Sequence, residues 1–315
     1  MADNTNISTW QAFCEFIEDY AKNDPDFIFI SLRDKLGGFD FPNLPPEKLI
    51  HCATNDPNAI LNAAGLALDG RKPWISGSSS TLVSRSYGQI REALAIPNLP
   101  VRIAVYDGGL SMGRDGASRL ITEDIAVMRS MPNMGVMIPS DSFTLAYTVE
   151  RALKCSGPVY LRLGQTPVPL LTADNEQNYR QAGARILREG SGVTIVTCGI
   201  MGHEALKASV ILEQQGISAE VLECCSVKPL PEQALLASVR STGCCVVAEE
   251  HSRIGGLCSA VAECLSETYP VPVKFVAIED QFVHSGTPAE LREYYGLTWK
   301  EIVNAASQAW ALRRR

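Results

Sequence analysis

Acidic and hydroxyl side chains stand next to short apolar stretches in the first half of the chain. Asp56 precedes an apolar helical stretch, Ser78 follows the apolar stretch 72–77, and Asp107 follows another at 101–106. Carboxylates and hydroxyls at such points can hold a ligand or move a proton. If the apolar stretches are parallel strands, ligands bind beyond their carboxyl ends. The candidate residues in these places are Asp56, Ser78, Asp107-Gly108-Gly109, Gly113-Arg114-Asp115-Gly116, Arg162, Gly199, Glu249-Glu250-His251 and Asp280.

Two glycine-containing segments have weaker claims to chemistry. GGLSMGRDG (108–116) matches neither a P-loop nor a G-x-G-x-x-G fingerprint, so the pattern favours a long loop turned by glycines over a phosphate cradle. EEHSRIGGL (249–257) places paired carboxylates and a histidine before a helix whose N-terminus can hold an anion. His251 can be a general base or a hydrogen-bonded histidine at a domain interface.

Composition excludes several classes of function. The chain has 315 residues, enough for two globular domains, and a formal net charge of -7, which argues against a nucleic acid or an anionic membrane as the partner. No signal peptide or membrane-spanning run is visible. The ten cysteines show no metal-site spacing with the four histidines. We therefore expect free thiols in a cytoplasmic protein.

The order of the elements predicts how the candidates are positioned. Strand-like stretches at 26–32, 72–77, 101–109, 134–140 and 158–163 alternate with helical ones at 58–70, 81–94, 122–131 and 143–155. The alternation weakens at 168–188 and then resumes from 193 to 312. This pattern predicts an α/β protein with two doubly wound, mostly parallel-sheet domains, at 1–167 and 189–315, joined by a linker at 168–188.

Longer blocks of sequence resemble the C-terminal half of transketolase, in the form of the small subunit of split transketolases. These blocks are collinear and cover nearly the whole chain: AAGLALDGRKPW, RDGASRLITEDIAVMRSMPNMGVMIPSD, GPVYLRLGQTPVP, TCGIMGHEAL, VVAEEHSRIGGLCSAVAE and IEDQFVHSGTPAELREYYGL. The resemblance implies a pyrimidine-binding domain followed by a transketolase C-terminal domain.

The same resemblance implies a cofactor and partners. Thiamine diphosphate would lie between this chain and a large subunit that holds the diphosphate and Mg²⁺, because no G-D-G-x(n)-N motif and no metal site occur here. A small-molecule ketose would be the substrate, and a two-fold dimer of such pairs would give a heterotetramer. Apolar runs such as 58–68 are expected at subunit contacts.

Several active-site positions depart from the family pattern. The family's essential glutamate falls on Asp56, and two aromatic positions that pack the aminopyrimidine fall on Ser78 and Thr81. Asp115 is retained. The remaining matched positions, at which we expect catalytic or substrate-binding roles, are Asp107 and Arg119 in place of histidines, Gln165 in place of a phosphate-gripping arginine, the nearby Arg162, and Arg33 in place of an aspartate.

Three interpretations of these departures remain open. The chain is part of a thiamine diphosphate enzyme with altered substrate, with Arg33 and Arg119 holding a different anion; or it is a non-catalytic partner subunit; or it binds another ligand in the same cleft. Asp56 has a structural alternative of its own, because Asp-Pro commonly starts a helix, with Asp as the N-cap and Pro57 at the first helical position.

Overall fold

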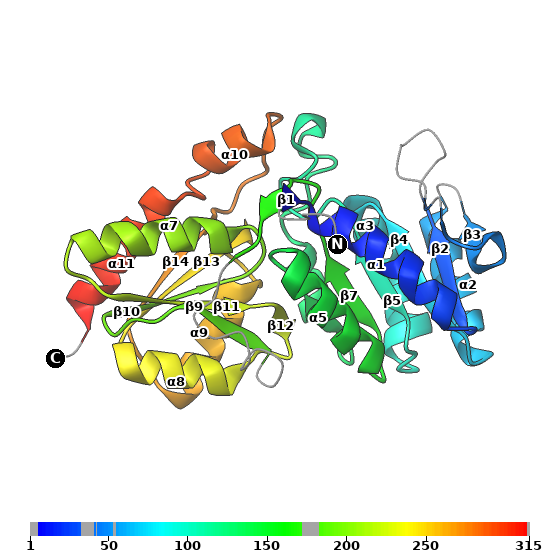
Figure 1. Ribbon diagram of the computed structural model, residues 1–315, viewed down its shortest axis with the longest axis horizontal. Helices are drawn as coiled ribbons and strands as arrows, with labels where there is room; N and C mark the ends of the chain where they lie inside the picture. The colour runs from blue at the N-terminus through cyan, green and yellow to red at the C-terminus, as the bar shows by residue number, and fades with distance from the viewer. Residues whose placement is uncertain (1–5, 33–40, 42, 53–54, 172–182, 314–315) are drawn as a thin grey trace.

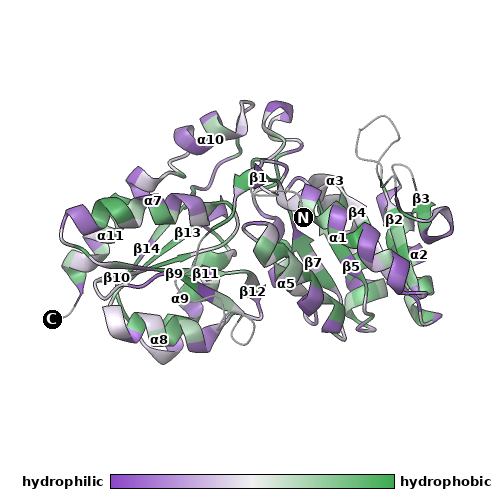
Figure 2. Ribbon diagram, viewed as in Figure 1, coloured by the Kyte–Doolittle hydropathy of each residue, from purple (hydrophilic) through white to green (hydrophobic). Residues whose placement is uncertain are grey.

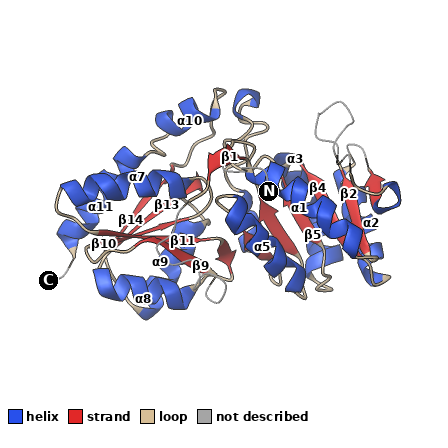
Figure 3. Cartoon of the chain, in the orientation of Figure 1, coloured by secondary structure: helices blue, strands red, loops and turns tan. Residues whose placement is uncertain are grey.

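The computed structural model describes residues 6–32, 41, 43–52, 55–171 and 183–313. They form two α/β domains side by side, each a sheet with helices on both faces (Figure 1). Figure 3 shows the same alternation of helices and strands along the chain. The predicted fold class, two doubly wound and mostly parallel sheets, is confirmed.

The first sheet has seven strands in the order β12-β6-β7-β5-β4-β2-β3. All neighbouring pairs are parallel except β12 and β6, which are antiparallel. Strand β12 comes from the second half of the chain, so that half completes the sheet of the first. The strands are β2 (Phe27–Ser31), β3 (Leu49–His51), β4 (Lys72–Gly77), β5 (Arg102–Val105), β6 (Gly135–Met137), β7 (Val159–Arg162) and β12 (Ser226–Lys228).

The second sheet has five strands in the order β14-β13-β10-β11-β9, with only β9 antiparallel to its neighbour. Its strands are β9 (Ala184–Arg188), β10 (Val193–Thr197), β11 (Ala219–Cys224), β13 (Cys245–Ser252) and β14 (Val273–Ile278). Strand β9 and the short β8 (Val168–Pro169), which pairs with β1 (Asn6–Ile7), both fall in the predicted linker. The boundaries 1–167, 168–188 and 189–315 themselves stay a prediction, and residues 172–182 lie outside the described residues.

Helices cover both faces of each sheet. On the first sheet, α1 and α5 share one apolar cluster, and α2, α3 and α4 share another. On the second sheet, α7 and α11 lie opposite α8 and α9 (Figure 1). The helices are α1 (Thr9–Asn23), α2 (Asp56–Leu68), α3 (Ser79–Gln89) with a π-helical end at Ile90–Ala95, α4 (Asp124–Arg129), α5 (Ser142–Lys154), α7 (Met201–Gln214), α8 (Glu232–Thr242), α9 (Leu257–Thr268), α10 (Pro288–Tyr294) and α11 (Trp299–Leu312).

The hydrophobic core crosses the junction between the two domains. One cluster of buried side chains runs from α2 and α3 through β6 and into α8 and α9. In Figure 2 the strands of both sheets are mostly green, whereas the helices carry purple on their outer sides. This pattern follows from burial, because parallel strands covered on both faces are apolar throughout and covering helices are apolar on one side only.

Two predicted helix starts are wrong. Helix α2 has Asn55, not Asp56, as its N-cap, and the Asn55 side chain accepts the Asn58 N–H at 3.3 Å. Asp56 is therefore the first helical residue, and its carboxylate is not used as a cap. Helix α4 likewise begins later than the helical stretch predicted at 122–131: its N-cap is Glu123 and its first helical residue is Asp124. Helix α1 was not predicted, although Trp10, Phe13 and Ile17 repeat at helical spacing and are buried.

A buried ionic network joins the second sheet to the start of α5 in the first domain. The Arg185 guanidinium on β9 donates to Glu223 on β11 at 2.6 Å and to Asp141, the N-cap of α5, at 3.2 Å. All three side chains are fully buried. Burial disfavours the charge of Arg185, but Glu223 and Asp141 outweigh it and hold the pKa of Arg185 above its ordinary value. Sequence reasoning missed this network.

We expect Arg185→Met to lower the free energy of unfolding by about 3–5 kcal/mol, because it leaves two buried carboxylates without their cation. Urea unfolding of the folded chain measures the loss. Arg240→Met is the matched control, since Arg240 is exposed on α8, and it should change stability by less than about 0.5 kcal/mol. Equal stabilities for the two variants would contradict the role given to the network.

Candidate functional site

The candidate site lies at the carboxyl ends of β3, β4 and β5, which are near neighbours in the first sheet. Helix α2 begins after β3, α3 begins after β4, and a long glycine-rich loop follows β5. Each element brings one candidate side chain to this edge: Asp56 starts α2, Ser78 is the N-cap of α3, and Asp107 starts the loop. The parallel register therefore gathers residues that are about fifty positions apart in the sequence.

Asp56 is a buried carboxylate with one oxygen engaged. Its side chain is 4% exposed, and Oδ1 accepts a hydrogen bond from the Thr81 hydroxyl at 3.2 Å. Among the residues that the structure describes, no hydrogen-bond partner occupies Oδ2. A buried carboxylate with an unused oxygen is suited to accept a proton or an N–H from a ligand.

Ser78, Thr81 and Asp107 continue the hydrogen-bond chain that starts at Asp56. Thr81 also lies 3.4 Å from the Ser78 carbonyl, and the Ser78 hydroxyl donates to Asp107 at 2.5 Å. The second Asp107 oxygen accepts the Ser79 N–H at the first turn of α3. Burial raises the pKa of Asp107, although its bonds from Ser78 and Ser79 favour the charged form. Asp107 thus fixes the start of α3 from the end of a neighbouring strand.

Asp115 and Arg119 lie on the loop after Asp107, apart from this chain of hydrogen bonds. Their side chains are both nearly half exposed, and Arg119 Nε lies 3.8 Å from Asp115 Oδ2. This loose pair is free to rearrange around a ligand. Arg33, predicted to share an anion with Arg119, lies outside the described residues.

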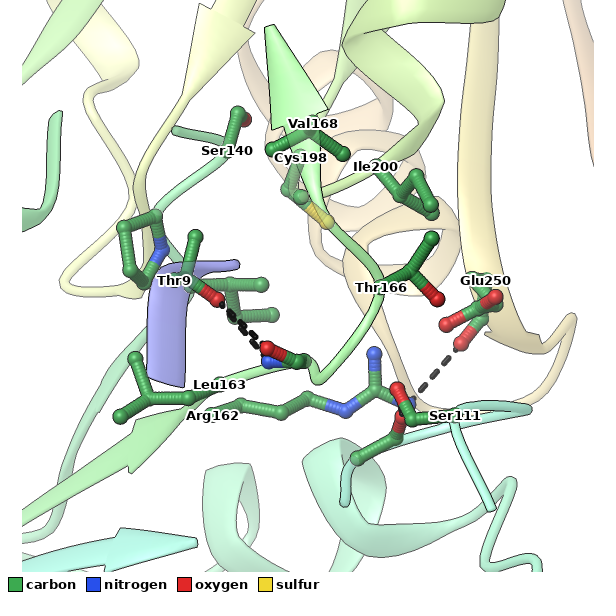
Figure 4. Close-up of a pocket in the computed structure, with 15 residues that line it drawn as sticks. Thr9, Ser111, Ser140, Arg162, Leu163, Thr166, Val168, Cys198, Ile200 and Glu250 are labelled. Carbon is green, nitrogen blue, oxygen red and sulfur yellow. Dashed lines mark hydrogen bonds between the residues drawn. The ribbon is translucent and has the colours of Figure 1, made fainter. Parts of the chain in front are cut away.

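Arg162 lies away from Asp56, at the junction between the two domains (Figure 4). Its Nε donates to Asp124 at 2.9 Å, and its terminal nitrogen donates to the Glu250 carbonyl at 2.9 Å. Tyr160 also donates to Asp124, and burial raises the pKa of Glu250 even though Arg162 and Arg292 oppose the shift. Glu250 and Arg162 line a cavity of about 40 Å³.

This cavity is large enough for one or two water molecules but not for a sugar. A substrate role for Arg162 therefore requires its guanidinium to leave Asp124. Gln165, beyond the end of β7, contacts Met112 through its side-chain amide at 3.5 Å and does not reach Asp56 through any described hydrogen bond. The structure brings Asp56, Ser78, Thr81 and Asp107 together, and it places Arg162 and Gln165 elsewhere.

The segment 249–257 is occupied by its own side chains. Glu249 accepts the Leu257 and Cys258 N–H groups at 2.8 and 2.7 Å, so a carboxylate of the protein fills the helix terminus that was predicted for an external anion. His251 Nε2 accepts the Ala126 N–H of α4 at 3.3 Å, and its Nδ1 donates to the Ser252 carbonyl. The interpretation of His251 as a hydrogen-bonded interface histidine is confirmed.

The described ranges contain neither a metal-binding cluster nor a membrane-spanning helix. No three His, Cys, Asp or Glu side chains in these ranges gather closely enough to bind a metal ion. No helix there is both long and apolar enough to cross a bilayer. The ten cysteines are thiols rather than disulfides, as expected.

Two family models together match most of the chain. Residues 5–169 match the transketolase pyrimidine binding domain, and residues 182–302 match the transketolase C-terminal domain. The chain therefore belongs to the transketolase family and carries its pyrimidine-binding and C-terminal domains.

Two relatives of similar length are named as transketolase subunits. The chain is 39% identical to a 6-deoxy-6-sulfo-D-fructose transketolase subunit from a Clostridium species, over 94% of this chain and 92% of the relative. It is 32% identical to an apulose-4-phosphate transketolase subunit of Phocaeicola vulgatus, over 96% and 97% of the two chains.

A solved structure described as a split gene transketolase, inactive beta4 tetramer, aligns with a TM-score of 0.89 and 38% identity, covering 98% of this chain and all of that one. Transketolase from Leishmania mexicana shares the fold at 17% identity, with a TM-score of 0.82, and this chain spans 46% of it.

We expect Asp107→Asn to lower the free energy of unfolding less at neutral pH than in mild acid. Since the pKa of Asp107 is raised in the folded state, the folded protein keeps a proton that the unfolded chain loses above about pH 4, and this contribution to stability falls as the pH rises toward the folded pKa. The stability lost on going from wild type to Asp107→Asn should therefore be smaller at about pH 7 than at about pH 4.

Urea unfolding of both proteins at the two pH values measures the difference, and Asp69→Asn, at an exposed carboxylate ending α2, controls for the loss of one negative charge. A loss of stability that grows with pH would show that burial does not dominate at Asp107.

Proposed function

We propose that this chain is the small subunit of a thiamine diphosphate-dependent, transketolase-like enzyme that transfers a ketol or acyl-type carbon unit. The observation that carries the proposal is the buried Asp56 carboxylate, one oxygen of which has no hydrogen-bond partner among the described residues. By resemblance, Asp56 stands at the position of the family's essential acid. A large subunit holding the diphosphate and Mg²⁺ would complete the site. The reduced thiols suit a reducing compartment, the cytoplasm.

The residues present fit the pyrimidine end of this cofactor. Asp56 Oδ2 would accept a ring N–H, and Thr81 would keep the Asp56 carboxylate oriented. The Ser78–Asp107 bond would fix the start of α3 next to the ring. When bound, thiamine diphosphate supplies the carbon nucleophile on which the transferred unit is carried. Mg²⁺ has no ligands in the described part of this chain and belongs to the large subunit's half of the site.

The site would be a remodelled version of the family's. Aspartate is one methylene shorter than glutamate, and a loss of about 1 Å of reach can cost on the order of 100-fold in rate unless the ligand or helix shifts to meet it. Ser78 and Thr81 supply hydroxyls where the family supplies aromatic packing. Asp107, Asp115, Arg119, Arg162 and Gln165 remain candidates for substrate contact, with Arg119 also proposed for a catalytic role because it stands in place of a histidine.

The names of the relatives suggest the kind of substrate. One relative is named for a sulfonated ketose and another for a phosphorylated one. Both carry a strong acid at one end of a sugar. We propose that this chain also acts on a sugar with such an acidic end group.

The second candidate is a non-catalytic partner subunit that keeps the fold for assembly. The bond between Ser78 and Asp107 favours it, because two predicted ligand-binding side chains are engaged with each other. The shortened acid and the missing aromatics point the same way.

Turnover by the assembled pair decides between the two candidates. We expect the chain, mixed with its large subunit, thiamine diphosphate and Mg²⁺, to cleave a ketose donor. Asp56→Asn should lower the rate by at least about 100-fold, because it removes the charge with little change of shape. Asp69→Asn, on the exposed end of the same helix, should leave the rate unchanged.

Calorimetric titration of the pair with thiamine diphosphate and circular dichroism of each variant confirm that assembly and folding survive. A wild-type pair that assembles without any thiamine diphosphate-dependent turnover would establish the non-catalytic interpretation. A fully active Asp56→Asn pair would remove Asp56 from the proposal.

Helix α2 is the proposed contact for self-association. Leu61 and Leu68 are 53% and 75% exposed, and Gly65 lies between them on the same side of the helix. A Cβ at Gly65 would meet nothing within 4 Å, so the packing of this chain does not require glycine there. Glycine in a helix interior costs roughly 0.5–1 kcal/mol relative to alanine, and close approach of a second copy of the chain would explain it.

Gly65→Gln should therefore separate folding from assembly. We expect the unfolding free energy of the isolated chain to rise by about 0.5 kcal/mol or more, since glutamine forms helix better than glycine. Self-association, measured by sedimentation velocity, should weaken because the new side chain fills the contact. Ala311→Gln, at an exposed position of α11, should leave association unaltered; equal association of the two variants would exclude α2 as the contact.

A further inference from the structure

The loop after Asp107 is held against the second domain at several points. Leu110 and Leu120, at its two ends, are buried in the apolar cluster of the second sheet. Between them, the Gly113 carbonyl accepts the Gly286 N–H at 3.1 Å. The loop is therefore fixed by the second domain although it belongs to the first.

Two glycines allow this close contact. Gly113 and Gly116 have φ values of +28° and +68°. A Cβ at Gly113 would lie 2.4 Å from the Gly286 carbonyl oxygen, and one at Gly116 would lie 2.7 Å from the Ser285 hydroxyl. The backbone at Gly113 can approach Gly286, and the backbone at Gly116 can approach the Ser285 side chain, only because neither glycine carries a side chain. The short 3₁₀ turn between them, Gly113–Asp115, is consequently a fixed platform.

The exposed side chains of residues 113–119, the platform and the residues that follow it, carry a net positive charge. Arg119 and Asp115 form the loose pair described above, and Arg114 is exposed at the centre of the turn. No hydrogen bond or ion pair joins the Arg114 guanidinium to any other described residue. The other arginines of this region are engaged: Arg162 with Asp124 and Arg129 with Glu263.

The platform lies at the same sheet edge as the candidate site. It continues directly from Asp107, whose carboxylate holds the start of α3 beside Thr81 and Asp56. Ligands of a parallel sheet bind beyond the carboxyl ends of its strands, so a sugar held by the cofactor would lie on the same side of the sheet as this loop. An unpaired guanidinium on a rigid turn is pre-organised for a phosphate or sulfonate, since its N–H groups match two oxygens of either anion.

We propose that Arg114, beside Arg119, binds the strong-acid end group of the sugar substrate and sets the preference for anionic over neutral sugars. This inference rests on the proposed function. The shared chemistry is a fully ionised tetrahedral oxyanion, carried either by a phosphate ester or by a sulfonate. Asp115 holds Arg119 at one side, and Arg114 supplies the charge that is not already paired.

Calorimetric titration of the assembled pair tests the proposal through binding alone. The probes are D-fructose 6-phosphate, 6-deoxy-6-sulfo-D-fructose and D-fructose. Wild type should bind at least one anionic sugar more tightly than fructose. Arg114→Gln should weaken that binding by about 10- to 100-fold, the usual effect of losing hydrogen bonds to a charged group, and leave fructose unaffected. Arg114→Lys, which keeps the charge without the fork, should lose less.

Arg240→Gln on α8 is the matched control and should bind all three sugars as wild type does. Loss of affinity for both anionic sugars supports recognition of the common oxyanion, and loss for one alone supports the proposal and identifies the end group. Equal binding of anionic sugars by wild type and Arg114→Gln overturns it, as does a wild type that prefers neither anionic sugar to fructose. Failure of the proposed function shows up differently, as missing cofactor-dependent turnover while Arg114-dependent binding persists.

Discussion

The buried guanidinium of Arg162 is the contact on which the arrangement of the two domains around the site depends. It leaves β7 of the first sheet, bonds Asp124 at the start of α4, and reaches the Glu250 carbonyl on β13 of the second sheet. Gly108 and Gly109 lie against it so closely that a Cβ on either would meet its side chain within 3 Å. The start of the 108–120 loop is thus set by a side chain that touches both domains.

This constraint gives the first domain's loop a position that its own sheet does not determine. The loop begins at Asp107, contacts the Arg162 side chain at Gly108 and Gly109, and ends where Leu120 packs with the second domain. Asp56, Thr81 and Ser78, in contrast, are positioned wholly within the first sheet. The residues beside Asp56 are therefore positioned by the first domain alone, whereas the 108–120 loop is positioned by both domains.

The fold was readable from the sequence because apolar strands and amphipathic helices alternate with little interruption. Helix α1 was missed although its apolar residues stand at helical spacing, and β12 was missed because three residues give no periodicity to read. The start of α2 was misplaced by one residue, since Asn55 and Asp56 are equally good caps by type and only the backbone decides between them.

The site was harder to read because side-chain partners come from distant positions. Resemblance to the family located Asp56, Ser78, Thr81 and Asp107, but nothing local shows that Ser78 and Asp107 bond to each other. Glu249 was noted as one of two carboxylates before a helix terminus predicted to hold an anion, and it holds the start of α9 itself. Arg185, in a strand next to the predicted linker, gave no sign of its two buried carboxylate partners, which lie 44 positions before it and 38 after it.

Strand β12 has a consequence for how the chain can be divided. It lies beyond the junction between the two family domains, yet it forms the edge of the first sheet next to β6. A chain cut between the domains would leave β6 as an unpaired edge, with its N–H and C=O groups open to any passing strand. Two separate family models match the two domains, but a shared sheet edge and a shared core make them one structural unit for the design of truncated forms.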